Sequence, residues 1–128
     1  MTFIEKLRAR WQKTNSMVCV GLDSDYSQIP ESFRSDPESV RSDAIVVRNP
    51  ALLGFSRARM RAFNREIVEA TRGFVCAYKP NIAFYEEWGR EGIKVLEGTI
   101  YFIRLQASDI PIILDAKRTD IGNTNKGY

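Results

Sequence analysis

The sequence predicts an α/β protein with a parallel sheet and a charged site at one end of that sheet. Three observations support this prediction. Short, continuous apolar runs recur at residues 17–22, 74–78 and 111–114. Segments with helical periodicity separate these runs, and charged or amide side chains follow each run directly. Because strands joined through helices run parallel, the three charged strand ends are expected to meet at one edge of the sheet.

The composition is that of an ordinary globular domain. Of 128 residues, 44% are hydrophobic and 27% are charged, which is enough apolar material for one core. The net charge of +3 suits an anionic small molecule as well as nucleic acid, and no array of interleaved basic and aromatic residues predicts nucleic-acid binding. No apolar run approaches the ~20 residues that span a membrane, and no secretory signal is present, so we expect a cytoplasmic protein without membrane contact.

The sequence contains no histidine, which excludes nucleophilic schemes that pair histidine with serine or cysteine. The two cysteines, Cys19 and Cys76, do not have the paired spacing of zinc ligands, so no metal site is predicted. Each lies within an apolar run, and both are expected to be buried free thiols in a reducing compartment.

The first predicted helix covers residues 3–13. Thr2 and Glu5 have the spacing of a capping box, in which each side chain accepts a hydrogen bond from a free backbone N–H. Three apolar residues then follow at helical spacing: Ile4, Leu7 and Trp11. The apolar run at 17–22 is predicted to be a strand buried on both faces, with a polar loop after it.

Residues 24–55 contain prolines and serines that interrupt any period, so they are predicted to be mostly loop with short helical pieces, and 44–47 is a candidate strand. A helix is predicted from Ser56 to about Gly73, with an apolar face made of Met60, Phe63, Ile67 and Ala70. The same helix carries basic residues for which a solvated face is favoured over a phosphate-binding one: Arg57, Arg59, Arg61 and Arg65.

The second strand, 74–78, leads into Lys79, Pro80 and Asn81. Proline fits at a strand end because it has no N–H to donate to a central ladder. A short helix is predicted around Phe84, Tyr85 and Trp88, ending near Gly89, and its aromatic residues are expected to pack rather than to bind a cofactor. A helix over 92–107 follows, with an apolar face of Ile93, Leu96, Ile100 and Ile103 and with Leu105 off that face. The third strand, 111–114, ends at Asp115.

The strand ends carry the candidate chemistry. Side chains alternate in a strand, so Asp115 and Lys117 point the same way, and Asp120 follows in a loop. Taken alone, this D-x-K-x-x-D pattern could equally be a surface ion pair contributing ~0–1 kcal/mol. Asp23 at the first strand end, with Lys79 and Asn81 at the second, makes a functional site the favoured interpretation.

Three segments resemble the bacterial type of orotidine 5′-phosphate decarboxylase. They read VGLD at 20–23, AYKPN at 77–81 and DAKRTDIGNT at 115–124, and the N-terminal FIEKL at 3–7 extends the similarity over most of the chain. The last segment is the most specific, because both spacing and flanking residues match. The family commonly has glycine where this chain has Thr119, and residues 36–59 match poorly.

The resemblance implies decarboxylation of orotidine 5′-phosphate to UMP by a TIM (β/α)8 barrel that works as a homodimer without cofactor or metal. It implies an alternating catalytic network of Lys79, Asp115, Lys117 and Asp120, with Lys117 protonating the substrate. Asp120 is expected to complete the partner subunit's site. Substrate contacts are implied for Asp23, Lys79, Asn81, Ile121 and Thr124.

A TIM barrel takes ~250 residues. The resemblance therefore implies a partial barrel of about the first three βα units, so that 1–128 is the N-terminal portion of a single decarboxylase domain. Such a portion is expected to leave apolar surface open and to self-associate. Two alternatives are an inactive or partner-binding fragment and a related magnesium-dependent sugar-phosphate decarboxylase or aldolase. Residues 78–81 and 120–124 favour the orotidine branch over the second of these.

Overall fold

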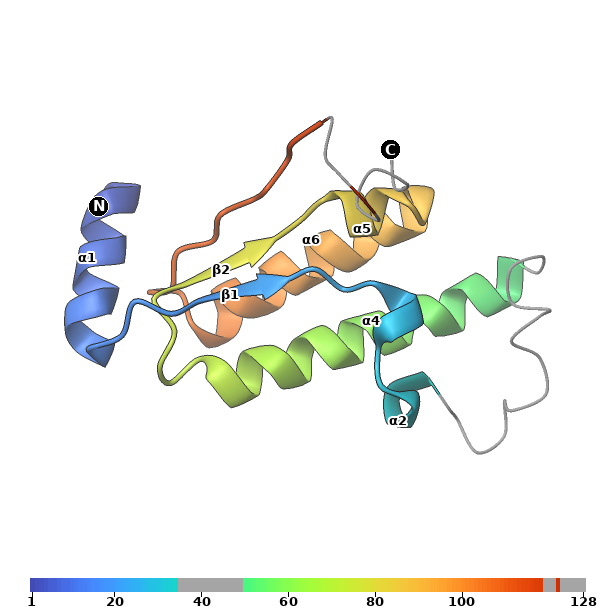
Figure 1. The fold of residues 1–128 in the computed structure, drawn as a ribbon, viewed down its shortest axis with the longest axis horizontal. Coiled ribbons are helices and arrows are strands. Elements are labelled where there is room, and N and C mark those ends of the chain that lie inside the picture. Colours follow the sequence, from blue (N-terminus) through green and yellow to red (C-terminus); the bar gives the residue numbers. More distant parts are fainter. Residues whose placement is uncertain (35–49, 119–121, 123–128) are drawn as a thin grey trace.

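A computed structural model describes residues 1–34, 50–118 and 122 (Figure 1). Helices separate its two strands, as the sequence predicts. In order they are α1 (Phe3–Thr14), β1 (Cys19–Leu22), η1 (Tyr26–Gln28), α2 (Glu31–Arg34), α4 (Pro50–Thr71), β2 (Ala77–Pro80), α5 (Ala83–Glu86) and α6 (Gly89–Gln106). None of the helices in the described ranges is long and apolar enough to cross a membrane. The candidate strand at 44–47 lies outside those ranges.

The two strands pair in parallel, in a register that runs from Cys19 opposite Ala77 to Leu22 opposite Pro80. The predicted third strand is only partly formed. Residues 111–115 lie along the other side of β2 but pair with it through two isolated parallel bridges, Tyr78 with Ile112 and Asn81 with Asp115.

Pro80 explains why the pairing between β2 and residues 111–115 is interrupted. The backbone N–H groups of Tyr78, Ile113 and Asp115 donate across the pair at 2.8–3.0 Å, to Pro111, Tyr78 and Pro80 in turn. The next donor in the parallel pattern would be residue 80, and proline has no N–H. The segment therefore keeps the position of a third parallel strand without a continuous ladder.

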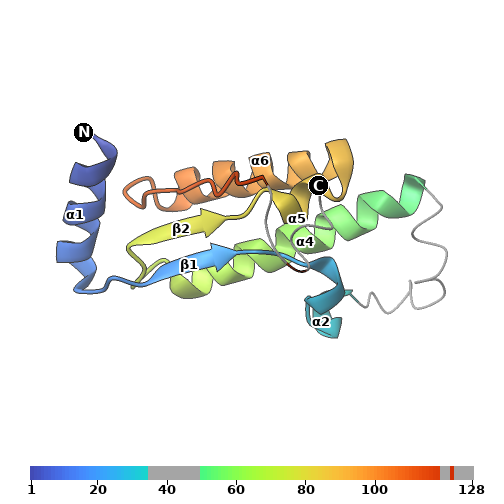
Figure 2. The same ribbon diagram turned by 45° about the horizontal axis from the view of Figure 1, so that its top comes forward.

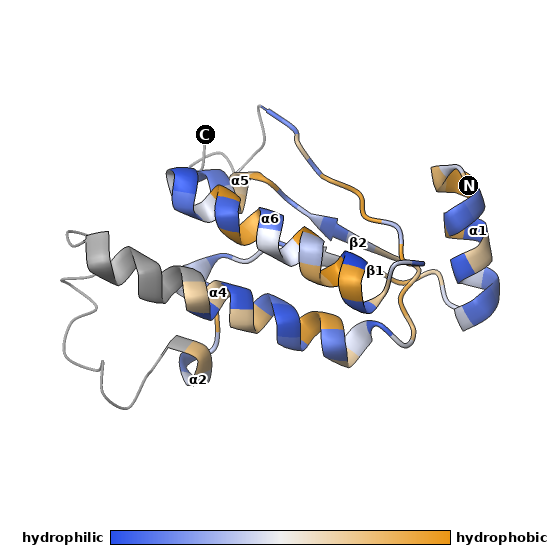
Figure 3. Cartoon of the chain, turned by 180° about the vertical axis from the view of Figure 1, so that it is seen from behind, coloured by the Kyte–Doolittle hydropathy of each residue, from blue (hydrophilic) through white to orange (hydrophobic). Residues whose placement is uncertain are grey.

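Helices α4 and α6 lie side by side on one face of the sheet (Figures 1 and 2). Eight buried side chains form the core between these helices and the strands: Leu22, Val68, Val75, Tyr78, Phe102, Ile103, Ala107 and Ile110. Hydrophilic residues recur along the sides of both helices that face away from the sheet (Figure 3). A second buried cluster lies toward the carboxyl ends of the strands and includes Met60, Tyr85 and Leu96.

Helix α1 lies across the start of the strands (Figure 1). Its predicted capping box is present, because Thr2 and Glu5 each accept the other's backbone N–H. The predicted apolar face of α1 is only partly buried, because Ile4 and Trp11 are exposed. The buried residue of α1 is Arg10, which donates to the backbone carbonyls of Val75 and Arg72 and to the Asp109 carboxylate. One cation, rather than an apolar stripe, is therefore the buried anchor of this helix.

The prediction that β1 is buried on both faces is wrong for the described residues. Leu22 is buried, but Met17, Val18 and Cys19 are exposed, and so are Ile113 and Leu114 in the third segment. The expectation that both thiols are buried is confirmed for Cys76 and is wrong for Cys19, which is exposed. The reason is that, among the residues that the structure describes, β1 is an edge strand and helices cover one face of the sheet (Figure 2).

Helix α4 begins at Pro50 rather than Ser56, which fits the preference of proline for a first helical turn. Its inward face is shifted from the predicted one. Met60, Asn64 and Val68 are buried at a spacing of four, whereas Ala70 is exposed. Helix α6 begins at Gly89, three residues before the predicted start, and buries Leu96 and Ile103 with Leu105 exposed, as expected.

Candidate active site

The parallel pairing brings the predicted charged residues to one edge of the sheet. Asp23 follows the last residue of β1, and Lys79 is the third residue of β2, opposite Gly21. Asp115 bridges to Asn81 at the end of β2, and Lys117 follows it. The expectation that three separate strand ends converge is therefore confirmed for these residues.

The four side chains alternate in charge through space as well as along the sequence. The Lys79 ammonium lies 3.7 Å from Asp23 Oδ1 and 3.4 Å from Asp115 Oδ2. Lys117 contacts the same Oδ2 atom of Asp115. The Asp115 side chain is 13% exposed, whereas that of Lys117 is 58% exposed, so Asp115 is the shielded centre of the cluster.

This arrangement keeps Asp115 ionised. The hydrogen bond from Lys117 is the main cause that lowers the pKa of Asp115 below its ordinary value, and the contact with Lys79 adds to it against the opposing effect of partial burial. Two ammonium groups thus share one carboxylate. The cluster can stabilise negative charge that develops beside it, and its lysines can supply a proton.

Asn81 is 6% exposed, and its side-chain oxygen accepts the backbone N–H of Ala83 at 3.2 Å. It therefore helps to start α5 beside the site, and a substrate contact for it stays a prediction. Asp120, Ile121 and Thr124 lie outside the described residues, and their roles also stay predictions.

Arg118 was not singled out from the sequence, yet it links the segment after Asp115 to α5. Its Nη2 lies 2.8 Å from Oε1 of Glu86. No pattern in the sequence relates these two residues, because the contact depends on how α5 packs beside the third segment.

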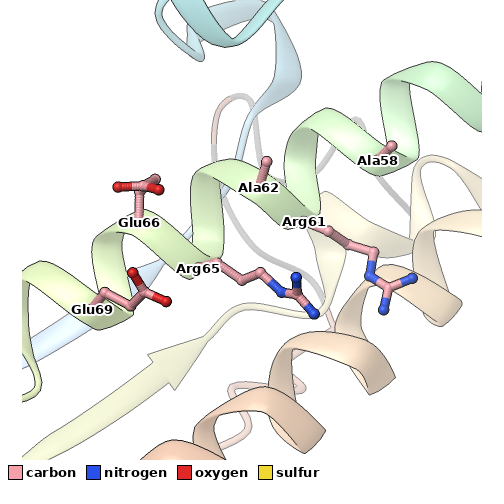
Figure 4. Close-up of a pocket in the computed structure, with 6 residues that line it drawn as sticks. All are labelled: Ala58, Arg61, Ala62, Arg65, Glu66 and Glu69. Atoms are coloured by element: carbon pink, nitrogen blue, oxygen red, sulfur yellow. The ribbon is translucent and has the colours of Figure 1, made fainter.

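Arg61 and Arg65 of α4 extend toward α6, and the Arg65 guanidinium lies 4.9 Å from the centre of the Phe102 ring (Figure 4). They line a shallow depression of about 510 Å³ together with Ala58, Ala62, Glu66 and Glu69. Their contacts with α6 fit packing and solvation. The structure thus adds nothing in favour of a phosphate-binding role.

A buried polar network behind the site was also missed. Asn64 of α4 is fully buried, accepts a hydrogen bond from Ser24 at 2.5 Å and donates to Tyr85 at 3.1 Å and to Thr99 at 3.0 Å. Burial raises the pKa of Tyr85 to about 12, so its hydroxyl stays protonated. The feature of the sequence that points to this network is an asparagine placed between two apolar residues of the same helix face, Met60 and Val68.

The fold and site define a class of protein: an α/β protein with a charged site at the carboxyl ends of parallel strands, as in enzymes built on barrel folds. A sequence model of the orotidine 5′-phosphate decarboxylase / HUMPS family matches residues 16–128, and the chain belongs to this family.

Two curated relatives are named orotidine 5′-phosphate decarboxylase. The one from Cellvibrio japonicus is 41% identical over 128 residues, which is 100% of this chain and 40% of the relative. The one from Herpetosiphon aurantiacus is 40% identical over 126 residues, 98% of this chain and 39% of the relative. The solved structure of Leishmania donovani OMP decarboxylase is 31% identical with a TM-score of 0.61, over 97% of this chain and 36% of that one. The chain thus spans about 40% of the length of these curated relatives.

Proposed function

We propose that this chain carries the Lys–Asp–Lys part of an active site that decarboxylates orotidine 5′-phosphate to UMP in pyrimidine biosynthesis. The observation that carries the proposal is the shared Asp115 carboxylate, which both Lys79 and Lys117 contact at the carboxyl end of the sheet. Membership of the decarboxylase family supports the choice of substrate.

The chemistry needs a fixed cation beside C6 of the pyrimidine. In the proposed step the bond from C6 to the carboxylate breaks, carbon dioxide leaves, and the electron pair stays on C6. The Lys117 ammonium stabilises this carbanion and gives it a proton, so that a C6–H bond forms, and water then reprotonates the lysine. Asp115 holds Lys117 in place, and its charge opposes the substrate carboxylate before that group departs. No cofactor or metal takes part.

The remaining residues are assigned to substrate binding. Asp23 and Lys79, whose charged groups lie 3.7 Å apart, are proposed to hold the ribose hydroxyls. Asn81, Ile121 and Thr124 are proposed to line the substrate site. Asp120 is proposed to complete the site of a second copy, so that the active species is a homodimer.

Residues 1–128 are proposed to form the N-terminal portion of a single decarboxylase domain, the first three βα units of a TIM barrel, in the cytoplasm. The chain aligns over its whole length with relatives of which it spans about 40%, which supports this assignment. A magnesium-dependent sugar-phosphate lyase is not favoured, because both curated relatives above are named for orotidine 5′-phosphate.

The test is a spectrophotometric decarboxylation assay of the purified chain, alone and co-expressed with the remaining portion of the Cellvibrio japonicus relative. The relative's own two portions, co-expressed in the same way, are the positive control. We expect turnover that persists in EDTA and is abolished by Lys117→Ala. If the relative's two portions are active together and this chain is inactive in both settings, the proposal is wrong and a partner-binding fragment is the better description.

A further inference from the structure

We propose that the buried Asn64–Tyr85 pair positions Asp23 at the end of β1, and that both are positioning residues for the active site. The proposal rests on the function proposed above for its biological meaning, but the geometry that supports it is independent of the substrate. The hydrogen bonds of the pair reach Leu22 and Ser24, the two residues on either side of Asp23, so we assign its effect to how those neighbours are held.

The network holds the residues on both sides of Asp23, Leu22 through its backbone carbonyl and Ser24 through its side chain. The Tyr85 hydroxyl donates to the backbone carbonyl of Leu22 at 2.9 Å. The Ser24 hydroxyl donates to Asn64 at 2.5 Å. Residues 22 and 24 are thus both held by buried groups, while the Asp23 side chain between them is 42% exposed and faces Lys79.

The network draws on three helices. Asn64 comes from α4, Tyr85 from α5 and Thr99 from α6, and each of them is 3% exposed or less. Both side-chain groups of Asn64 are used, because its oxygen accepts from Ser24 and its nitrogen donates to Tyr85 and Thr99. A buried network in which every member has a partner is rigid, and the loss of one member leaves the others unsatisfied.

Rigidity at this position matters because, within the part of the chain that the structure describes, the Asp23 carboxylate has one long charged contact. Its carboxylate lies over Gly21, 3.5 Å from where a side-chain Cβ would be, and its charged contact with Lys79 is 3.7 Å long. Such an exposed pair does not hold a strand end in place. We therefore assign the orientation of Asp23 to the network behind it.

The test compares Tyr85→Phe with Tyr78→Phe. Both tyrosines are fully buried, and each hydroxyl donates to a backbone carbonyl, Leu22 for Tyr85 and Val68 for Tyr78. Only Tyr85 is linked to the end of β1. The two variants therefore remove the same hydroxyl group from equally buried positions. They differ in which backbone carbonyl loses its hydrogen bond, that of Leu22 or that of Val68.

The first readout is amide hydrogen exchange in the 128-residue chain. The Asp25 amide donates to the Asp23 carbonyl, and the Cys76 amide donates to Val18 at the start of the sheet. We expect Tyr85→Phe to speed exchange at Asp25 about tenfold relative to Cys76, and Tyr78→Phe to leave that ratio unchanged. The Asp23 carboxyl carbon resonance should shift in the first variant only. Equal effects of both variants would overturn the positioning role.

Ser24→Ala is the milder variant if Tyr85→Phe does not fold. It removes one hydrogen bond of the network and should change the Asp25 exchange ratio in the same direction. Titration of the reconstituted two-portion enzyme with UMP is the second readout, and Tyr85→Phe should weaken binding about tenfold with Tyr78→Phe unchanged. Failure of the unsubstituted reconstituted enzyme to bind UMP would count against the proposed function, whereas the exchange ratio alone decides the positioning role.

Discussion

The Lys79 ammonium lies 3.4 Å from the Asp115 carboxylate, although 36 residues separate them in sequence. The contact exists because β2 and the third segment are parallel neighbours, which brings their carboxyl ends together. Lys117 reaches the same oxygen atom from two residues further along the chain. One carboxylate therefore organises two cations.

Asp115→Asn should lower decarboxylation by at least about a hundredfold in the reconstituted enzyme, because the two lysines lose the anion that orients them. The helix content should not change, since the side chain lies at the edge of the core. Activity is measured by the absorbance change and folding by circular dichroism. Glu69→Gln, on the outer side of α4, is the matched loss of one negative charge. Retained activity in Asp115→Asn would contradict the assignment.

Acid should lower the free energy of unfolding, and protonation of Asp109 should account for part of that loss. The hydrogen bond from Lys13 is the main cause that lowers the pKa of Asp109 below 3.8, and the charge of Arg10 adds to it. A lowered pKa means that the carboxylate stabilises the fold above pH 3.8 and that this contribution is lost as the pH falls through the folded-state value. Asp109 is 46% exposed, so the expected contribution is about 1 kcal/mol or less.

Urea unfolding of the original chain and of Asp109→Asn, at pH 7 and pH 3, measures this contribution. The difference in unfolding free energy between the two proteins should shrink at pH 3. A constant difference would mean that Asp109 acts by packing and not by charge.

Arg10→Met should destabilise the chain by about 2–4 kcal/mol. Arg10 is 5% exposed and satisfies two backbone carbonyls and one carboxylate, which methionine cannot do. Arg8→Met is the matched control, because Arg8 is exposed on the same helix and should change the free energy by less than about 0.5 kcal/mol. Similar urea midpoints for the two variants would show that α1 is not anchored by Arg10.

Gly92→Ala should be poorly tolerated, because an added Cβ would lie 1.8 Å from the Tyr85 carbonyl oxygen and would force α5 and α6 apart. We expect a loss of about 1–3 kcal/mol, as for other overpacked sites. Gly73→Ala introduces the same methyl group where nothing lies within 4 Å, so it should be neutral or slightly stabilising. Thermal unfolding separates the two, and equal melting temperatures would refute the close approach of α5 and α6.

The purified chain should self-associate through the uncovered side of its sheet. Met17, Val18, Ile113 and Leu114 are all exposed on or beside the strands. Exposed apolar residues next to a strand edge favour association between chains. Sedimentation velocity should show a mass that rises with concentration, and Val18→Lys should reduce this effect more than Leu105→Lys on the outer side of α6. A monomer at all concentrations would contradict the prediction.

The amino-acid sequence by itself determined the local elements and the residues of the candidate site. The capping box of Thr2 and Glu5 defines where α1 begins, and the apolar spacing from Leu96 to Ile103 defines the inward side of α6. These features follow from interactions between residues close in the chain. The positions of Asp23, Lys79 and Asp115 after apolar runs also follow from the sequence, because parallel strands end at a common edge.

Only the tertiary structure decided which surfaces are buried and what supports the site. Arg10 becomes the buried anchor of α1 because carbonyls of Arg72 and Val75, more than 60 residues away, are presented to it. Asn64 belongs to the inward face of α4 because Ser24, Tyr85 and Thr99 surround it. Such contacts join residues that are distant in sequence, so their energies depend on packing that no local pattern encodes.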